Sequence, residues 1–174
     1  MKNFKLNEKD ILSNQDWTFP TTTYYGPGRF NEIGKFCEEF DIKNPLIVTD
    51  SGSKDLPFIK KLIALLSKNN IKSDLFYNIS PNPRDDEISK GCDQFKNGSH
   101  DSIIAIGGGS AMDGGKSICL TVNSETPLWD FEFEQPVPKI TKENAFPKII
   151  TIPTTAGTGA ETEITAMVTH LEKG

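Results

Sequence analysis

The chain has 174 residues and a formal net charge of -5, with 36% hydrophobic and 25% charged residues. These values are typical of a globular domain with its own core, and the acidic balance argues against nucleic acid as a partner. No apolar run approaches the ~18 residues of a membrane span, and the N-terminal residues lack the apolar stretch of a signal peptide. We therefore expect a cytoplasmic protein with no membrane partner.

Strand-like and helix-like segments alternate along the chain, which is typical of an α/β domain with a mainly parallel sheet. Strands are predicted over residues 18–25, 46–49, 72–77, 102–106, 148–152 and 162–169. Helices are predicted over residues 30–40, 55–68, 85–96 and 111–122, and residues 123–146 are expected to form a long surface loop. The pattern predicts a Rossmann-like parallel sheet flanked by helices, with residues 1–174 forming one dinucleotide-binding domain.

The cysteines and histidines give no sign of a metal site. Cys37, Cys92 and Cys119 are far apart and form no CxxC pair, so we expect them to be small buried hydrophobic residues. His100 follows a polar turn and His170 lies near the end of the chain, and both are expected to be exposed. We predict no metal ligand and no catalytic residue within this chain.

Small or polar residues follow four of the predicted strands. They are Asp50, Asn82, the segment Gly107–Ser110 and the segment Thr154–Thr158, which we name the glycine loop and the threonine loop. In an open parallel sheet, ligands bind outside the carboxyl ends of the strands. The sequence therefore predicts a ligand site at this edge of the sheet.

The glycine loop is the most specific of these features. Without a Cβ, the backbone of Gly107, Gly108 and Gly109 can approach a phosphate closely. N–H groups at the start of the following helix can then bind the anion, and Ser110 can add a hydroxyl donor and cap the helix. The alternative is a tight strand-to-helix turn without a ligand. Three successive glycines exceed what a turn requires, which favours phosphate binding.

The other strand ends carry groups suited to a nucleotide, each with a structural alternative. The carboxylate of Asp50 can bind ribose hydroxyls and repel a 2′-phosphate, which favours NAD over NADP, or it can cap the next helix. Asn82 can pair with ribose or adenine, or form an Asx turn. Thr154, Thr155 and Thr158 offer hydroxyls for phosphate or ribose, although threonine also favours strand ends.

Two better-known phosphate motifs do not fit. The G-x-G-x-x-G pattern would need a glycine where Met112 stands, and the P-loop pattern would need one at Ser110. The near match to a P-loop would make Lys116 its lysine, although this residue lies well inside the predicted helix. Asp113 and Lys116 are three residues apart on one helix face and are expected to pair.

Two long segments resemble one known family. Residues Gly107–Lys116 are similar to the GGGSxxDxxK signature of iron-containing alcohol dehydrogenases, and Ile152–Glu161 resembles their IPTTAGTGSE segment. Ala160 stands where serine is frequent in that segment. Leu46–Asp50 and Pro81–Pro83 match two further landmarks of the family, in the same order. The resemblance spans essentially the whole chain.

The resemblance implies a dehydroquinate-synthase-like N-terminal domain that binds NAD(P), followed in the family by a helical domain that binds iron or another divalent metal. It implies that Asp50 and Asn82 contact the adenosine, Gly108 to Ser110 the pyrophosphate, and the threonine loop the phosphates and nicotinamide ribose. It also implies a dimer that interconverts small alcohols and aldehydes by hydride transfer.

The family's metal ligands, one Asp and three His, lie beyond the position that corresponds to Gly174, so we expect this chain alone to be inactive and to lack the metal domain. Three alternatives stay open. They are a glycerol dehydrogenase or dehydroquinate synthase relative, a non-catalytic nucleotide-binding module, and a P-loop NTPase.

Overall fold

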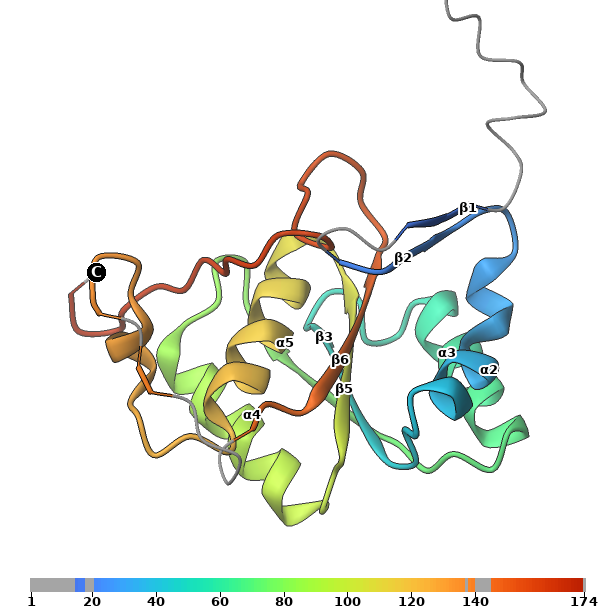
Figure 1. Ribbon diagram of the computed structural model, residues 1–174, viewed down its shortest axis with the longest axis horizontal. Coiled ribbons are helices and arrows are strands. Elements are labelled where there is room, and N and C mark those ends of the chain that lie inside the picture. The colour runs from blue at the N-terminus through green and yellow to red at the C-terminus, as the bar shows by residue number, and fades with distance from the viewer. Residues whose placement is uncertain (1–14, 18–20, 137, 140–144, 174) are drawn as a thin grey trace, which may run out of the picture.

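Four parallel strands form the centre of the protein in the computed structural model, which describes residues 15–17, 21–136, 138–139 and 145–173. The strands are β3 (Pro45–Asp50), β4 (Asp74–Ile79), β5 (Ser102–Gly107) and β6 (Lys148–Pro153). They lie in the order β4-β3-β5-β6, and every neighbouring pair is parallel. The predicted α/β fold class is confirmed (Figure 1).

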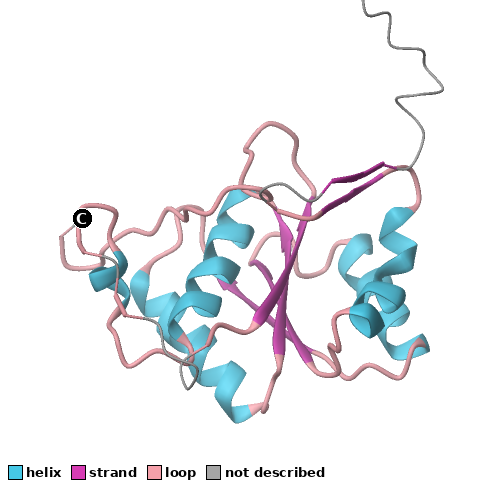
Figure 2. Ribbon diagram, in the orientation of Figure 1, coloured by secondary structure: helices cyan, strands magenta, loops and turns pink. Residues whose placement is uncertain are grey.

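Helices cover both faces of this sheet (Figures 1 and 2). The short 3-10 helix η1 (Arg29–Glu32), α2 (Ile33–Glu39) and α3 (Pro57–Lys68) lie on one face. On the other face lie α4 (Asp85–Asn97) and α5 (Gly109–Thr121). Another 3-10 helix, η2 (Leu128–Phe131), lies within the predicted long loop. All four predicted helices are present, with their ends shifted by a few residues.

The sheet divides the core into two apolar layers, because both faces of a parallel sheet are covered. In the α2–α3 layer, Ile47 of β3 and Ile104 of β5 pack with Ile59 and Leu62 of α3. In the α4–α5 layer, Val48 and Ala105 from the same two strands pack against Met112 of α5. All six residues of β5 are buried, which confirms the prediction of a central strand.

Helix α5 lies unusually close to the sheet because it carries two adjacent glycines. A Cβ on Gly115 would lie 2.5 Å from the Cβ of Ala105, and one on Gly114 would lie 2.7 Å from Cδ1 of Ile79. Any larger residue would therefore push the helix outward. The close packing fixes the position of the N-terminus of α5 relative to the end of β5.

Two predicted strands differ from the structure. Within residues 18–25 only β2 (Thr23–Tyr25) is a strand, and it pairs in antiparallel fashion with β1 (Gln15–Trp17), while residues 18–20 lie outside the described part. Residues 162–169 form no strand, and a single bridge joins Thr169 to Arg84. Their alternating pattern suits a strand, but the segment runs along α5, where no described strand pairs with it.

The expectation that both histidines are exposed is wrong for His100. His100 is only 6% exposed. Its ring packs against Phe95, and its Nδ1 lies 3.0 Å from the carbonyl oxygen of Asn44. This contact joins segments 56 positions apart, which a local reading of a polar turn cannot detect. His170 is half-buried and stacks on Trp129. No described helix has the length and apolar character needed to span a membrane.

The cysteines are buried or half-buried free thiols, which confirms their predicted packing role. Burial raises the pKa of the Cys119 thiol to about 12, and burial with the nearby charge of Asp101 raises the pKa of Cys37 to about 11.

At pH 8 we expect roughly one Cys37 side chain in a thousand to be a thiolate, and a smaller fraction of Cys119. Ellman's reagent should modify both only after unfolding, and rapid labelling of either in the native protein would contradict this packing.

Substitution of Gly115 by alanine should destabilise the protein. The added methyl would overlap Ala105 of the central strand, and overpacking of this kind costs about 1–3 kcal/mol in the free energy of unfolding. The measurement is urea unfolding followed by circular dichroism. Ser67→Thr adds one methyl on the exposed face of α3 and is the matched control, with an expected change within about 0.5 kcal/mol. Equal stability of the two variants would refute the proposed tight contact.

Candidate functional site

The carboxyl edge of the sheet contains a point where the chain direction switches. Strands β3 and β5 are neighbours, but the chain continues from β3 to β4 on one side and from β5 to β6 on the other. Loops leaving two such strands diverge and open a crevice where ligands bind in α/β sheets. Asp50 ends β3 and Gly107 ends β5, and a Cβ on Gly107 would lie 3.2 Å from Oδ2 of Asp50.

Asp50 does not cap the next helix. Helix α3 begins at Pro57 with Leu56 as its N-cap, six residues further along the chain. The half-buried carboxylate instead accepts a hydrogen bond of 2.7 Å from the hydroxyl of Ser53, which fixes its orientation. Because this bond involves Oδ2, the other carboxylate oxygen keeps its acceptor capacity.

The glycine loop connects β5 directly to α5. Gly107 has a φ of 151°, a conformation that side-chain-bearing residues rarely adopt. Gly108 is the N-cap of α5, and no described side chain caps the first turn. The sequence suggested Ser110 as the cap of this helix, and this prediction is wrong. Ser110 lies inside the helix, and its Oγ accepts the N–H of Asn82 at 3.4 Å. The first-turn N–H groups are thus available to an anion.

The threonine loop lies over this helix terminus. Its first residue, Thr154, donates its backbone N–H to the carbonyl oxygen of Gly107 at 2.8 Å. A Cβ on Gly108 would lie 3.5 Å from Oγ1 of Thr155, and one on Gly109 would lie 3.5 Å from Cγ2 of Thr158. All three threonines are exposed. The two loops therefore place backbone N–H groups and threonine hydroxyls side by side.

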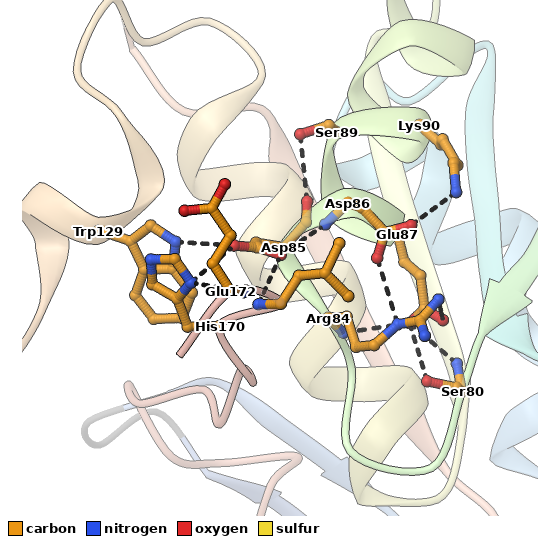
Figure 3. Close-up of polar contacts among 11 residues, drawn as sticks. Ser80, Arg84, Asp85, Asp86, Glu87, Ser89, Lys90, Trp129, His170 and Glu172 are labelled. Carbon is orange, nitrogen blue, oxygen red and sulfur yellow. Dashed lines mark hydrogen bonds and ion pairs between the residues drawn. The ribbon is translucent and has the colours of Figure 1, made fainter. Parts of the chain in front are cut away.

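Asn82 belongs to a turn that Glu87 braces from both ends (Figure 3). Oε2 of Glu87 accepts the N–H and the hydroxyl of Ser80 and the N–H of Arg84, each at 3.1 Å. The guanidinium of Arg84 lies 3.4 Å from the other oxygen of this buried carboxylate. Asn82 has a φ of 59°, and its side-chain amide makes no hydrogen bond to another described residue. The Asx-turn alternative is therefore not observed, and the amide faces solvent.

A second carboxylate ties the last described residues to the start of α4 (Figure 3). Asp85 accepts hydrogen bonds from the indole N–H of Trp129 at 3.0 Å and the backbone N–H of Leu171 at 3.2 Å. The ring of His170 stacks on Trp129 with centroids 4.7 Å apart. Thr169 donates its N–H to the carbonyl of Pro83 at 2.7 Å, so this cluster also supports the turn that carries Asn82.

A hollow of about 650 Å³ lies beside that cluster, between α4 and the segment around η2. Asp85, Asp93, Glu125 and Glu172 are among its lining residues, and none of the nine predicted cofactor residues lines it. It is apart from the strand ends where the candidate groups converge, so we do not assign the site to it. Among the described residues, no group of three His, Cys, Asp or Glu side chains is placed to bind a metal ion.

The structure brings together the nine residues that the sequence singled out. Asp50 lies beside Gly107, and hydrogen bonds link Asn82 to Ser110 and the glycine loop to the threonine loop. Two supporting residues, Ser53 and Glu87, were not predicted from the sequence. A glutamate three residues into a helix is a recognised signal for bonding back to the helix start, and could have identified Glu87.

Lys116 is not placed like the lysine of a P-loop. It lies in the middle of α5, 3.3 Å from Asp113 as predicted, and its ammonium donates to the carbonyl oxygens of Glu163 and Thr165. These contacts turn Lys116 toward the segment that follows the threonine loop. Lys116 therefore cannot serve as the phosphate-binding lysine of a P-loop, which argues against the P-loop NTPase alternative.

Comparisons with known proteins agree with this geometry. The chain is 32% identical over 170 residues to a choline dehydrogenase of Bacillus subtilis, covering 97% of this chain and 42% of that protein. It is 31% identical to the NADH-dependent butanol dehydrogenase A of Clostridium acetobutylicum, covering 90% of this chain and 39% of that protein. The structure of sulfoacetaldehyde reductase from Bifidobacterium kashiwanohense in complex with NAD+ superimposes with a TM-score of 0.74, at 27% identity, over 86% of this chain and 38% of that one.

The chain thus spans about two fifths of the length of these relatives. The matched part corresponds to the α/β domain with its parallel sheet. The sequence model of the iron-containing alcohol dehydrogenases matches residues 20–174, which include every strand of the main sheet and both loops. The chain belongs to the iron-containing alcohol dehydrogenase family.

Proposed function

We propose that this chain is the NAD-binding part of an alcohol dehydrogenase that interconverts small primary alcohols and aldehydes. The observation that carries the proposal is the uncapped N-terminus of α5, preceded by glycines and covered by the threonine loop. A helix terminus of this kind attracts a pyrophosphate through free N–H groups and the helix dipole. The butanol dehydrogenase that depends on NADH and the reductase in complex with NAD+ support the same choice of ligand.

The residues present suit a dinucleotide. A Cβ on Gly108 or Gly109 would project toward Thr155 or Thr158, so glycine keeps a space open between the two loops. In this proposal Gly107 sets the turn, Gly108, Gly109 and Ser110 bind the pyrophosphate, and Thr154, Thr155 and Thr158 bind phosphate and nicotinamide ribose. When bound, NAD supplies the nicotinamide ring that accepts or donates the hydride.

Asp50 and Asn82 would bind the adenosine end. Asp50 lies at the end of β3, and Asn82 lies in the braced turn after β4, where its N–H contacts Ser110 of α5. A carboxylate can accept hydrogen bonds from both ribose hydroxyls but repels a 2′-phosphate. This charge favours NAD over NADP.

The described residues contain no group of side chains that fits the iron of the family name. We propose that a metal-binding domain of a longer protein supplies it and that this chain alone is inactive. The substrate class and the dimer remain predictions of the family resemblance, and the cytoplasmic location and the single domain over residues 1–174 remain predictions of the sequence pattern.

Titration calorimetry of the chain with NAD tests the cofactor site. We expect saturable binding that Gly109→Val weakens by at least about tenfold, because the branched side chain would fill the space beside the helix terminus. Ala64→Val on the exposed face of α3 introduces the same residue and should leave the affinity unchanged. Wild-type affinity in Gly109→Val would exclude this terminus as the anion site, and binding of MgATP in place of NAD would overturn the proposal.

The role of Asp50 has a separate test. Asp50→Gly removes the charge that would face a 2′-phosphate, so the affinity for NADP relative to NAD should rise about tenfold. Asp55→Gly removes one charge from the same connection at an exposed position and serves as the control. The two dissociation constants are measured by calorimetry for each variant. An unchanged ratio in Asp50→Gly would remove this residue from cofactor selection.

A further inference from the structure

The pair formed by Asp113 and Lys116 has no part in the proposed cofactor contacts, although both residues belong to the motif that begins with the glycine loop. Their side chains are only 14% and 15% exposed. A charged pair that is largely removed from water is costly unless each charge has well-placed partners. The partners of the ammonium therefore indicate its role.

The ammonium of Lys116 has three oxygen partners, one in an ion pair and two as hydrogen-bond acceptors. The ion pair is with Oδ1 of Asp113 at 3.3 Å, and the acceptors are the carbonyl oxygen of Glu163 at 3.2 Å and the carbonyl oxygen of Thr165. Asp113 belongs to α5 itself. The other two belong to a segment 47 and 49 positions further along the chain.

Lys116 attaches the first part of this segment to the helix. In the described part of the chain, residues 163–168 form no strand pairing, and their large side chains Ile164 and Met167 are 93% and 76% exposed. Burial holds only the end of the stretch, where the half-buried Val168 packs against the α4–α5 core layer, and no ladder of backbone bonds fixes residues 163–167. Two hydrogen bonds from Lys116, to the carbonyl oxygens of Glu163 and Thr165, connect this stretch to α5.

The same segment continues directly from the threonine loop. At its start, the loop is attached to β5 through Thr154 and Gly107. At its far end, Glu163 donates its N–H to the carbonyl of Gly159, and its own carbonyl accepts from Lys116. The loop is therefore fixed at both ends to the β5–α5 unit that carries the glycine loop.

We infer that Lys116, oriented by Asp113, is a positioning residue that holds the threonine loop over the N-terminus of α5. It does so without touching the cofactor. The inference rests on the proposed NAD site for its functional consequence, but the loop contact itself does not. The contacts of Lys116 with Asp113, Glu163 and Thr165, which we name the clamp, order the threonine hydroxyls before the ligand arrives. This order lowers the entropy lost on binding.

Lys116→Met tests the clamp, because methionine fills similar space and donates no hydrogen bond. Hydrogen exchange of the protein without NAD, read by mass spectrometry, should show faster exchange in peptides covering residues 154–165. NAD affinity should fall roughly tenfold, and Lys116→Arg should recover part of both effects because it keeps a charged donor. Lys60→Met, at an exposed position of α3, is the matched control and should change neither.

A variant that keeps the lysine guards against misfolding as an explanation. Asp113→Asn preserves shape and leaves the ammonium with its two carbonyl acceptors, so we expect a smaller increase in loop exchange and unchanged exchange in β5. Unchanged loop exchange in Lys116→Met would overturn the clamp. Loss of NAD affinity with unchanged exchange would also overturn it, since Lys116 would then act on the cofactor directly. If the wild-type chain failed to bind NAD, the proposed function would fail while the exchange measurement still tested the clamp.

Discussion

The close contact between α5 and the central strands is the constraint on which the remaining structure depends. Gly114 and Gly115 allow the helix to approach Ile79 and Ala105 at distances that any side chain would prevent. This approach sets where the helix begins relative to the end of β5, and hence where its free N–H groups point. It also places Asp113 and Lys116 toward the segment after β6. One packing contact thus positions both the proposed anion site and the Lys116 contacts to the segment after the threonine loop.

The sequence predicted the sheet and its loops because their signals are local. An apolar run followed by glycines predicts a buried strand ending in a turn, and β5 with the glycine loop follows this rule. The same local reading was wrong for residues 162–169, since an alternating pattern forms a strand only when a neighbouring strand is available to pair. It was also wrong for His100, whose burial depends on Asn44, far away in the chain.

In the candidate site, too, local signals were predictable from the sequence and long-range contacts were not. The sequence singled out the residues that we propose face a ligand, because small and polar residues follow four of the predicted strands. It did not identify most of the residues that orient them. Glu87 braces the Asn82 turn through three hydrogen bonds, and Ser53 orients Asp50, yet glutamate and serine are common in helices and turns. Support of this kind becomes visible only when the distances between side chains are known.

The four strand ends that converge at this edge come from four different strand-to-helix or strand-to-loop connections. Residues from Asp50 to Thr158 must all be in place before these strand ends meet, so the contacts between them are long-range in sequence. A ligand that needs all four strand ends binds the native state and not the unfolded chain. Thermodynamic linkage then makes the ligand a stabiliser of the entire sheet, with a midpoint of thermal unfolding that rises with ligand concentration.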